Sequence, residues 1–105
     1  MTKIIVELTE PVTHGGTELT ELEFRKIATK DLIAIGNVYN FSGDDDEVAI
    51  DVNTKRISKY IVKLASVPPS VVSSLSTEDF VACQDVVLGF FRKLGEKRQQ
   101  KTSNE

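Results

Sequence analysis

The sequence has very few of the residues on which catalysis and metal binding in small proteins depend. Its 105 residues include one cysteine, one histidine and no tryptophan. Cys83 is alone, which excludes an internal disulfide, and its apolar neighbours favour a buried core residue over a reactive thiol. His14 precedes two glycines, which is typical of a turn rather than of a ligand or a base. One cysteine and one histidine are too few for a Cys/His zinc site. A Ser-His-Asp triad would have to use His14, which is expected in a turn. We therefore expect a non-enzyme with no catalytic residue, cofactor or metal.

Long apolar runs are also absent. No stretch approaches the ~18 consecutive apolar residues that a membrane span needs, and Glu7 comes too early for the apolar core of a signal peptide. The hydrophobic content of 40% is ordinary and the net charge is only −3, which argues against a disordered chain. We therefore expect a folded protein of the cytoplasm with no membrane partner.

Basic charge is scarce in most of the chain and gathers at its end. Residues 92–105 have a net positive charge, whereas residues 1–91 are acidic, most densely at 44–47. Nucleic-acid modules usually carry a basic face on the fold itself, so we expect no nucleic-acid partner. The acidic run resembles the start of a calcium loop, but Ala49 and Lys55 stand where that loop needs glycine and glutamate. We predict a solvated acidic loop there.

The length fits one domain, and the patterns along it predict the α+β class. We predict a single compact domain over residues 1–95 and a polar, basic, disordered tail over residues 96–105. Within the domain, an N-terminal antiparallel β-hairpin over 3–26 precedes a helical part over 29–94. That part is expected to contain three to four helices that form a small bundle.

The hairpin is predicted from alternating apolar and polar residues, which occur over residues 3–9 and again over 18–26. We expect Pro11 to end the first strand because proline lacks the donor for a ladder hydrogen bond. Residues 14–16 supply the glycines of the turn. Ile5 breaks the alternation, so we expect it to meet a helix or a partner.

Helical periodicity covers the remainder of the chain. Thr29 is the predicted N-cap of a first helix whose apolar stripe reaches Tyr39. Residues 47–66 are predicted as the next helix, although the first half of this stretch also alternates like a strand. Two prolines end it, and Pro69 can open a short helical turn over 70–75.

The last helix is predicted to begin after Ser76, a favoured N-cap, and to run from Thr77 to about Leu94, ending near Gly95. Its apolar residues cover an arc of about 220°, which is much wider than the ~100° that a surface helix needs. We infer that this helix is central to the fold and still keeps part of its apolar surface for another chain.

Four short stretches follow one another in a recognisable order. They are IIVELTEPV at 4–12, GTELTELEFR at 16–25, ATKDL at 28–32, and LASVPP at 64–69, which is followed by LSTEDF at 75–80 and by a helix ending in two phenylalanines at 90–91. With these motifs the chain resembles, over about residues 3–94, the small tail assembly chaperones of contractile-tailed temperate phages of the P2-like and Mu-like kinds. Lys30 stands where the family tends to have glycine, and the acidic segment at Asp44 has no counterpart.

The resemblance implies a non-catalytic chaperone that binds the tape measure protein, a long helical chain. Such a chaperone keeps the tape measure protein soluble and assists tail tube subunits in assembling around it. The resemblance further implies the tail tube protein as a second partner, a location in the host cytoplasm, and absence from the mature virion. A second copy of the chain is another candidate partner, because the wide apolar helix could pair two copies.

We place the partner-binding surface on apolar residues of the last helix and on two earlier positions, each of which a place in the core would also explain. The candidate residues are Val81, Leu88, Phe91, Leu94, Ile5 and Tyr39.

Two other functions are left open by the sequence. A small DNA-binding regulatory protein would use the helices near residues 57–94 and the basic tail, and a DNA column would retain it in a salt-dependent manner. A structural tail component of the virion would instead be found in purified particles.

Overall fold

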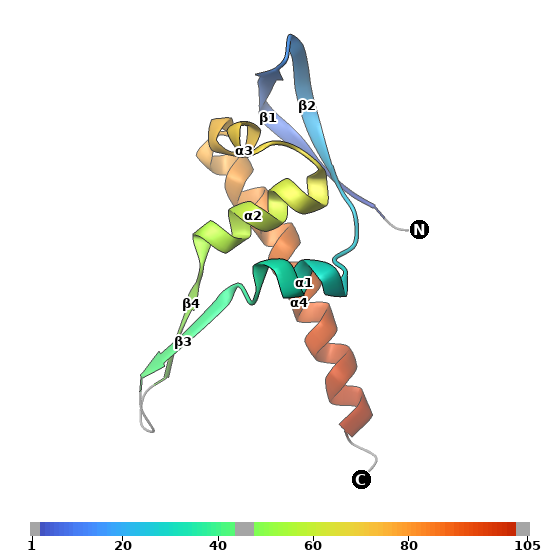
Figure 1. The fold of residues 1–105 in the computed structure, drawn as a ribbon, viewed down its shortest axis with the longest axis vertical. Helices are drawn as coiled ribbons and strands as arrows, with labels where there is room; N and C mark the ends of the chain where they lie inside the picture. The colour runs from blue at the N-terminus through green and yellow to red at the C-terminus, as the bar shows by residue number, and fades with distance from the viewer. Residues whose placement is uncertain (1–2, 44–47, 103–105) are drawn as a thin grey trace.

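The protein is an elongated α+β structure in which two hairpins and one long helix extend from a small core (Figure 1). The computed structural model describes residues 3–43 and 48–102. Its extents are 55 × 34 × 24 Å, and its radius of gyration of 15.8 Å exceeds the ~13 Å of a compact chain of this length. The elements are β1 (Ile4–His14), β2 (Thr17–Phe24), α1 (Thr29–Ile35), β3 (Tyr39–Gly43), β4 (Val48–Val52), α2 (Thr54–Ala65), α3 (Pro69–Ser74) and α4 (Thr77–Thr102).

The predicted N-terminal antiparallel hairpin followed by helices is confirmed. β1 pairs with β2 from Ile4 opposite Phe24 to His14 opposite Thr17. The alternation places Leu22 and Phe24 in the core, because successive side chains of a strand point to opposite faces.

The expectation that Pro11 ends the first strand is wrong. The register shifts between Glu7 and Val12, so β1 bulges there and pairing resumes with Val12 opposite Leu19. Pro11 lies inside this bulge, where no ladder hydrogen bond is required of it. The strand therefore passes the proline and continues to His14.

A second hairpin, made by β3 and β4, occupies residues that were predicted as the end of one helix and the first half of the next. α1 ends at Ile35 because Gly36 adopts a φ of 98°, so Tyr39 begins β3 instead of continuing the helix. The first half of the predicted helix 47–66 is β4, which pairs antiparallel with β3. The alternation of apolar residues at 48, 50 and 52 was therefore a strand signal. The predicted acidic loop, with its calcium alternative, lies outside the described residues.

α2 corresponds to the second half of the predicted helix 47–66, and α3 follows the prediction closely. Asn53 caps α2 by accepting a hydrogen bond from the backbone N–H of Arg56 at 3.1 Å. The helix buries one stripe, consisting of Ile57, Tyr60, Ile61 and Leu64. Pro69 opens the short α3 at a position where its missing N–H costs nothing.

α4 begins as predicted but does not end as predicted. The Ser76 hydroxyl accepts a hydrogen bond from the backbone N–H of Asp79 at 3.1 Å, which is the expected N-cap contact. The expected end near Gly95 is wrong, because the helix continues to Thr102. A helix interior tolerates a single glycine at a cost of only ~1 kcal/mol relative to alanine.

One apolar cluster joins the hairpin, α2, α3 and α4. Its central members are side chains with almost no exposed surface: Leu22, Phe24, Val38, Ile57, Tyr60, Ile61, Leu64, Val72, Cys83 and Val87. Cys83 is thus a buried core residue, as predicted. The core lies against the first half of α4, and Figure 1 shows the rest of the helix running past it.

Candidate protein-binding site

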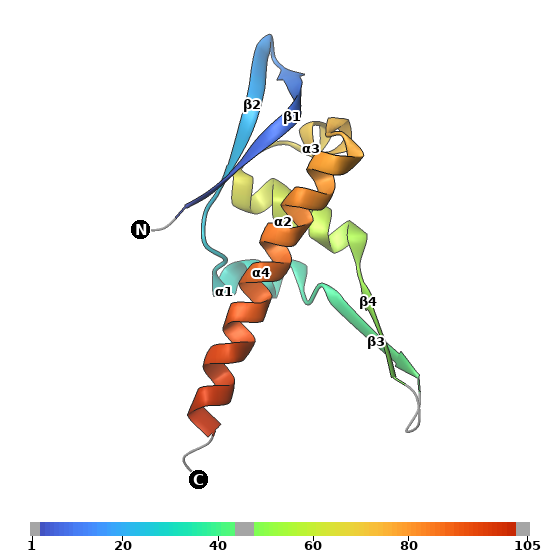
Figure 2. The ribbon, with the colours of Figure 1, turned by 180° about the vertical axis from the view of Figure 1, so that it is seen from behind.

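α4 is the element with the largest uncovered face. In Figure 2, which views the molecule from behind, α4 lies in front of the other elements and none of them crosses it. Its buried residues Asp79, Cys83 and Val87 recur every four positions, so a single stripe faces the core. The opposite side of the helix therefore faces solvent.

Two of the predicted contact residues on α4 are exposed apolar side chains. Val81 has 45% of its surface exposed, and Leu94 has 44%. Val81 belongs to the outer side of the helix. Leu94 continues the core-facing stripe of Val87, but it is exposed and is not a member of the buried core. Both positions offer apolar surface that no part of the described chain covers.

The other two predicted residues on α4 contribute to packing. Leu88 is half-buried and touches the core with part of its side chain. Phe91 is also half-buried, and its ring meets Tyr60 edge-on with centroids 5.5 Å apart. It meets Tyr39 in the same way at 6.3 Å. Aromatic pairs favour this edge-to-face geometry, so Phe91 and Tyr39 help to seat α4 on β3 and α2.

The remaining predicted residue, Ile5, is on another element. It is 53% exposed on β1, where it lies opposite Glu23 on the outer face of the hairpin. The structure thus brings Phe91 together with Tyr39, places Val81 and Leu94 on different sides of α4, and leaves Ile5 on the hairpin. It also exposes Ile33 on α1 and Ile50 on β4, which sequence reasoning missed. The signal for Ile33 was available, because this isoleucine falls off the apolar stripe of its helix.

A buried carboxylate fixes the start of α4 to the first hairpin. Asp79 accepts hydrogen bonds from the backbone N–H of Thr9 and of Glu10, at 3.0 and 3.2 Å, and from the Thr9 hydroxyl at 3.0 Å. These N–H groups lie in the bulge of β1, where the ladder with β2 is interrupted. The hydrogen bonds stabilise the ionised form and hold the pKa of Asp79 below its ordinary value, against the opposing effect of burial.

A second buried carboxylate joins the hairpin to α1. Asp31 accepts both arms of the Arg25 guanidinium, at 2.9 and 3.0 Å, and the backbone N–H of Ala28 at 2.8 Å. The Arg25 hydrogen bonds are the main reason that the pKa of Asp31 lies below its ordinary value. Arg25 therefore pairs with Asp31 and connects the end of β2 to α1.

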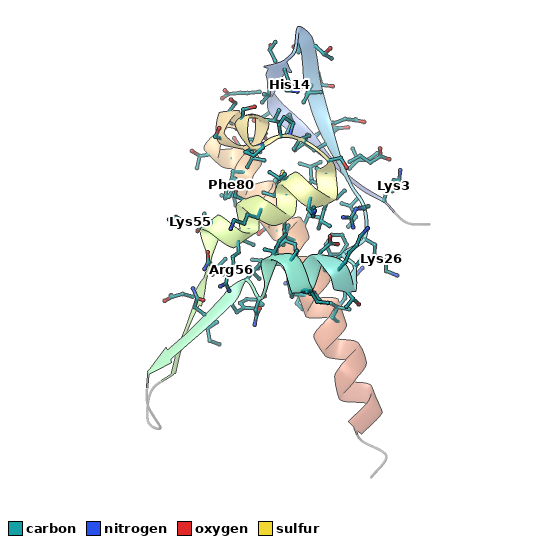
Figure 3. All side chains as sticks on the ribbon, in the orientation of Figure 1. Lys3, His14, Lys26, Lys55, Arg56 and Phe80 are labelled. Atoms are coloured by element: carbon teal, nitrogen blue, oxygen red, sulfur yellow. The ribbon has the colours of Figure 1, made fainter. Side chains whose placement is uncertain are left out.

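Polar contacts also attach the end of α1 to α2. The Tyr60 hydroxyl donates to the carbonyl oxygen of Gly36 at 2.6 Å, and burial raises the pKa of this phenol. Arg56, labelled in Figure 3, donates from Nη1 to the carbonyl oxygen of Asn37 at 2.8 Å. These anchors join the base of the first hairpin, α1, α2 and the start of α4 into one frame.

The described residues show no catalytic or metal-binding arrangement. A shallow groove of about 360 Å³ lies between α2, α3 and the start of α4. Its lining lacks histidine, cysteine and carboxylate side chains and consists of Thr54, Lys55, Ser58, Val72, Ser73, Leu75, Thr77 and Phe80. His14 is not among these lining residues and lies at the end of β1, on the first hairpin (Figure 3). Over residues 3–43 and 48–102, no group of three metal-ligating side chains comes together. No helix in this part of the chain combines the length and apolar character that crossing a membrane requires.

Comparison with known proteins gives one match that covers most of the chain. Residues 5–92 match the family model described as phage tail assembly chaperone proteins, E, or 41 or 14. Neither the curated proteins nor the solved structures contain a match. The matched segment includes both hairpins and the four helices up to the second half of α4. The chain therefore belongs to the family of phage tail assembly chaperones.

Proposed function

We propose that this chaperone binds the tape measure protein through the exposed apolar surface of α4. The binding keeps the tape measure protein soluble while tail tube subunits assemble around it, and it involves no catalysis. The single observation that supports this most directly is the exposure of Val81 and Leu94 on the longest helix of the molecule.

The physical basis is helix-against-helix recognition. A long helical tape measure chain exposes apolar stripes until the tube covers them, and such stripes associate when left in water. Exposed apolar side chains of α4 can cover part of such a stripe by packing against it. Asp79 holds the start of α4 in place, so little order has to be imposed on this part of the chaperone when it binds.

The net charge of −3 is consistent with a temporary role. The acidic residues lie mainly in the body, and they keep the complex soluble by repelling other acidic surfaces. We place this activity in the host cytoplasm, with the tail tube protein as a second partner that displaces the chaperone. The chaperone is then absent from the finished virion.

Co-expression with the tape measure protein of the same phage tests this proposal. We expect the wild-type chain to keep the tape measure protein in the soluble fraction and to co-purify with it. The double variant Val81→Asp, Leu94→Asp should lose both effects, because each aspartate places a charge on the proposed apolar contact. Ile50→Asp is the control, since this isoleucine is also an exposed apolar residue but lies on β4.

Folding of each variant is checked by helical circular dichroism, which exposed positions should leave unchanged. A folded double variant that still solubilises the tape measure protein would place the contact elsewhere. Stoichiometric recovery of the chain from purified virions would instead identify a structural tail component.

A further inference from the structure

The outer side of α4 carries a second pattern that concerns its charges. Val81, Asp85, Leu88 and Arg92 follow one another at spacings of four, three and four residues, so they form one stripe along the helix. Val81, Asp85 and Arg92 are exposed, and Leu88 is half-exposed between the two charges. The stripe therefore reads apolar, acidic, apolar and basic from the start of the helix towards its end.

We propose that two copies of this chain pair through this stripe, with their α4 helices antiparallel. In this arrangement, Asp85 of each copy lies opposite Arg92 of the other, and a two-fold axis passes between Leu88 and Gly89. The same surface serves both copies, so one favourable charge pair is made twice. Self-pairing does not depend on the tape measure protein, although the two partners would compete for Val81 and Leu88.

The charges select the orientation of the pair. Asp85 and Arg92 are seven residues apart, which corresponds to about 10 Å along a helix. Antiparallel packing around their midpoint brings each acid to the base of the other copy. Parallel packing in register would place Asp85 beside Asp85 and Arg92 beside Arg92, and like charges at such positions repel.

The middle of the stripe permits close approach. Gly89 has no side chain, and a Cβ built there would meet only Arg92 within 4 Å, at 3.7 Å from Nη2. Leu88 of the second copy can therefore pack near the backbone of α4. A single helix pair of this length covers less than the ~1,200 Å² at the lower limit of stable interfaces, so we expect a weak dimer that forms at high micromolar concentration.

Sedimentation equilibrium of the chain alone tests the pairing, over concentrations from about 10 μM to about 1 mM, a range set by the small interface. We expect a reversible monomer–dimer equilibrium. Asp85→Arg and Arg92→Asp should each weaken the dimer at least about tenfold, because each creates two like-charge contacts. The double variant Asp85→Arg, Arg92→Asp should restore dimerisation, since it exchanges the charges without removing the pairs. A chain that stays monomeric throughout this range overturns the proposal, as does a double variant that remains as weak as the single variants.

Disulfide cross-linking tests the orientation independently. Leu88→Cys places two thiols beside the two-fold axis, whereas Val81→Cys places them about 22 Å apart in the antiparallel pair. We expect rapid oxidation to a covalent dimer only for Leu88→Cys. The wild-type chain is the background control, because Cys83 is buried. Equal cross-linking of both variants would indicate parallel helices and overturn the proposed arrangement.

Discussion

The carboxylate of Asp79 accepts the backbone N–H of Thr9 at 3.0 Å, which ties the first turn of α4 to the bulge of β1 across 70 positions of the sequence. A bulge leaves backbone donors without partners in the sheet, and this acid supplies the missing acceptor. The start of α4 is therefore fixed to the hairpin. Its end beyond the core has no comparable polar anchor among the described residues, and that end carries Leu94.

Removing the charge of Asp79 should loosen this joint. In Asp79→Asn, one acceptor oxygen becomes an amide group that opposes the N–H donors of Thr9 and Glu10. We expect the midpoint of thermal unfolding to fall by roughly 5–15 °C, because these N–H donors lose a charged acceptor. Glu78→Gln is the matched control, since Glu78 is exposed in the same turn. Equal midpoints for both variants would show that the contact contributes little to stability.

The two buried carboxylates predict how stability depends on pH. The pKa values of Asp31 and Asp79 are lowered by folding, so the unfolded chain binds more protons in acid. Their contribution is complete above the unfolded value of about 4 and is lost as the pH falls through the folded values. Urea unfolding measured between pH 7 and pH 3 should therefore show a steep loss of the free energy of unfolding below pH 4. The double variant Asp31→Asn, Asp79→Asn should show a shallower loss, and an unchanged slope would contradict this assignment.

The outer face of the first hairpin contains two like charges whose repulsion a substitution can remove. Glu7 lies directly opposite Glu21 in the register of β1 and β2. Like charges opposite each other destabilise a sheet, so Glu21→Lys should raise the midpoint of thermal unfolding by about 1–4 °C. Glu18→Lys introduces the same charge change opposite Thr13 and should have a smaller effect. The difference should shrink in high salt, and a salt-independent difference would point to another cause.

Cys83 should resist modification in the folded protein. It is buried in the core, and burial raises the pKa of its thiol to about 11. At pH 8 we expect an aromatic disulfide reagent to react only as fast as the protein opens, and to react at once after denaturation. Val81→Cys provides an exposed thiol in the same helix as a control. Reaction of wild-type Cys83 at the rate of that control thiol would mean that α4 detaches from the core readily.

The sequence was sufficient to predict the elements whose signals are local. Ser76 with the acids that follow it indicated the start of α4, and the periodicity of Ile57 to Leu64 indicated the buried face of α2. The width of the apolar arc of α4 correctly indicated that part of this helix is exposed and part is core.

The features that the sequence did not predict are of two kinds. In some, one stretch fits both a strand and a helix pattern; in others, the contact is with a residue far away in the sequence. The alternation of β4 could be fitted to the start of a helix, and only pairing with β3 decides between the two. Asp79 looked like an ordinary acid in a first turn, because its partner Thr9 lies too far along the chain to be paired from sequence. The end of α4 was placed at Gly95 because glycine often ends helices, although it does not always do so.

Methyl NMR of the chain during titration with a helical segment of the tape measure protein tests the proposed contact most directly. We expect the methyl signals of Val81, Leu88 and Leu94 to shift or broaden on binding, while those of Ile50 on β4 stay unchanged. Binding that moves the Ile50 signals and leaves the three residues of α4 unaffected would show that the exposed face of α4 is not the surface that this chaperone uses.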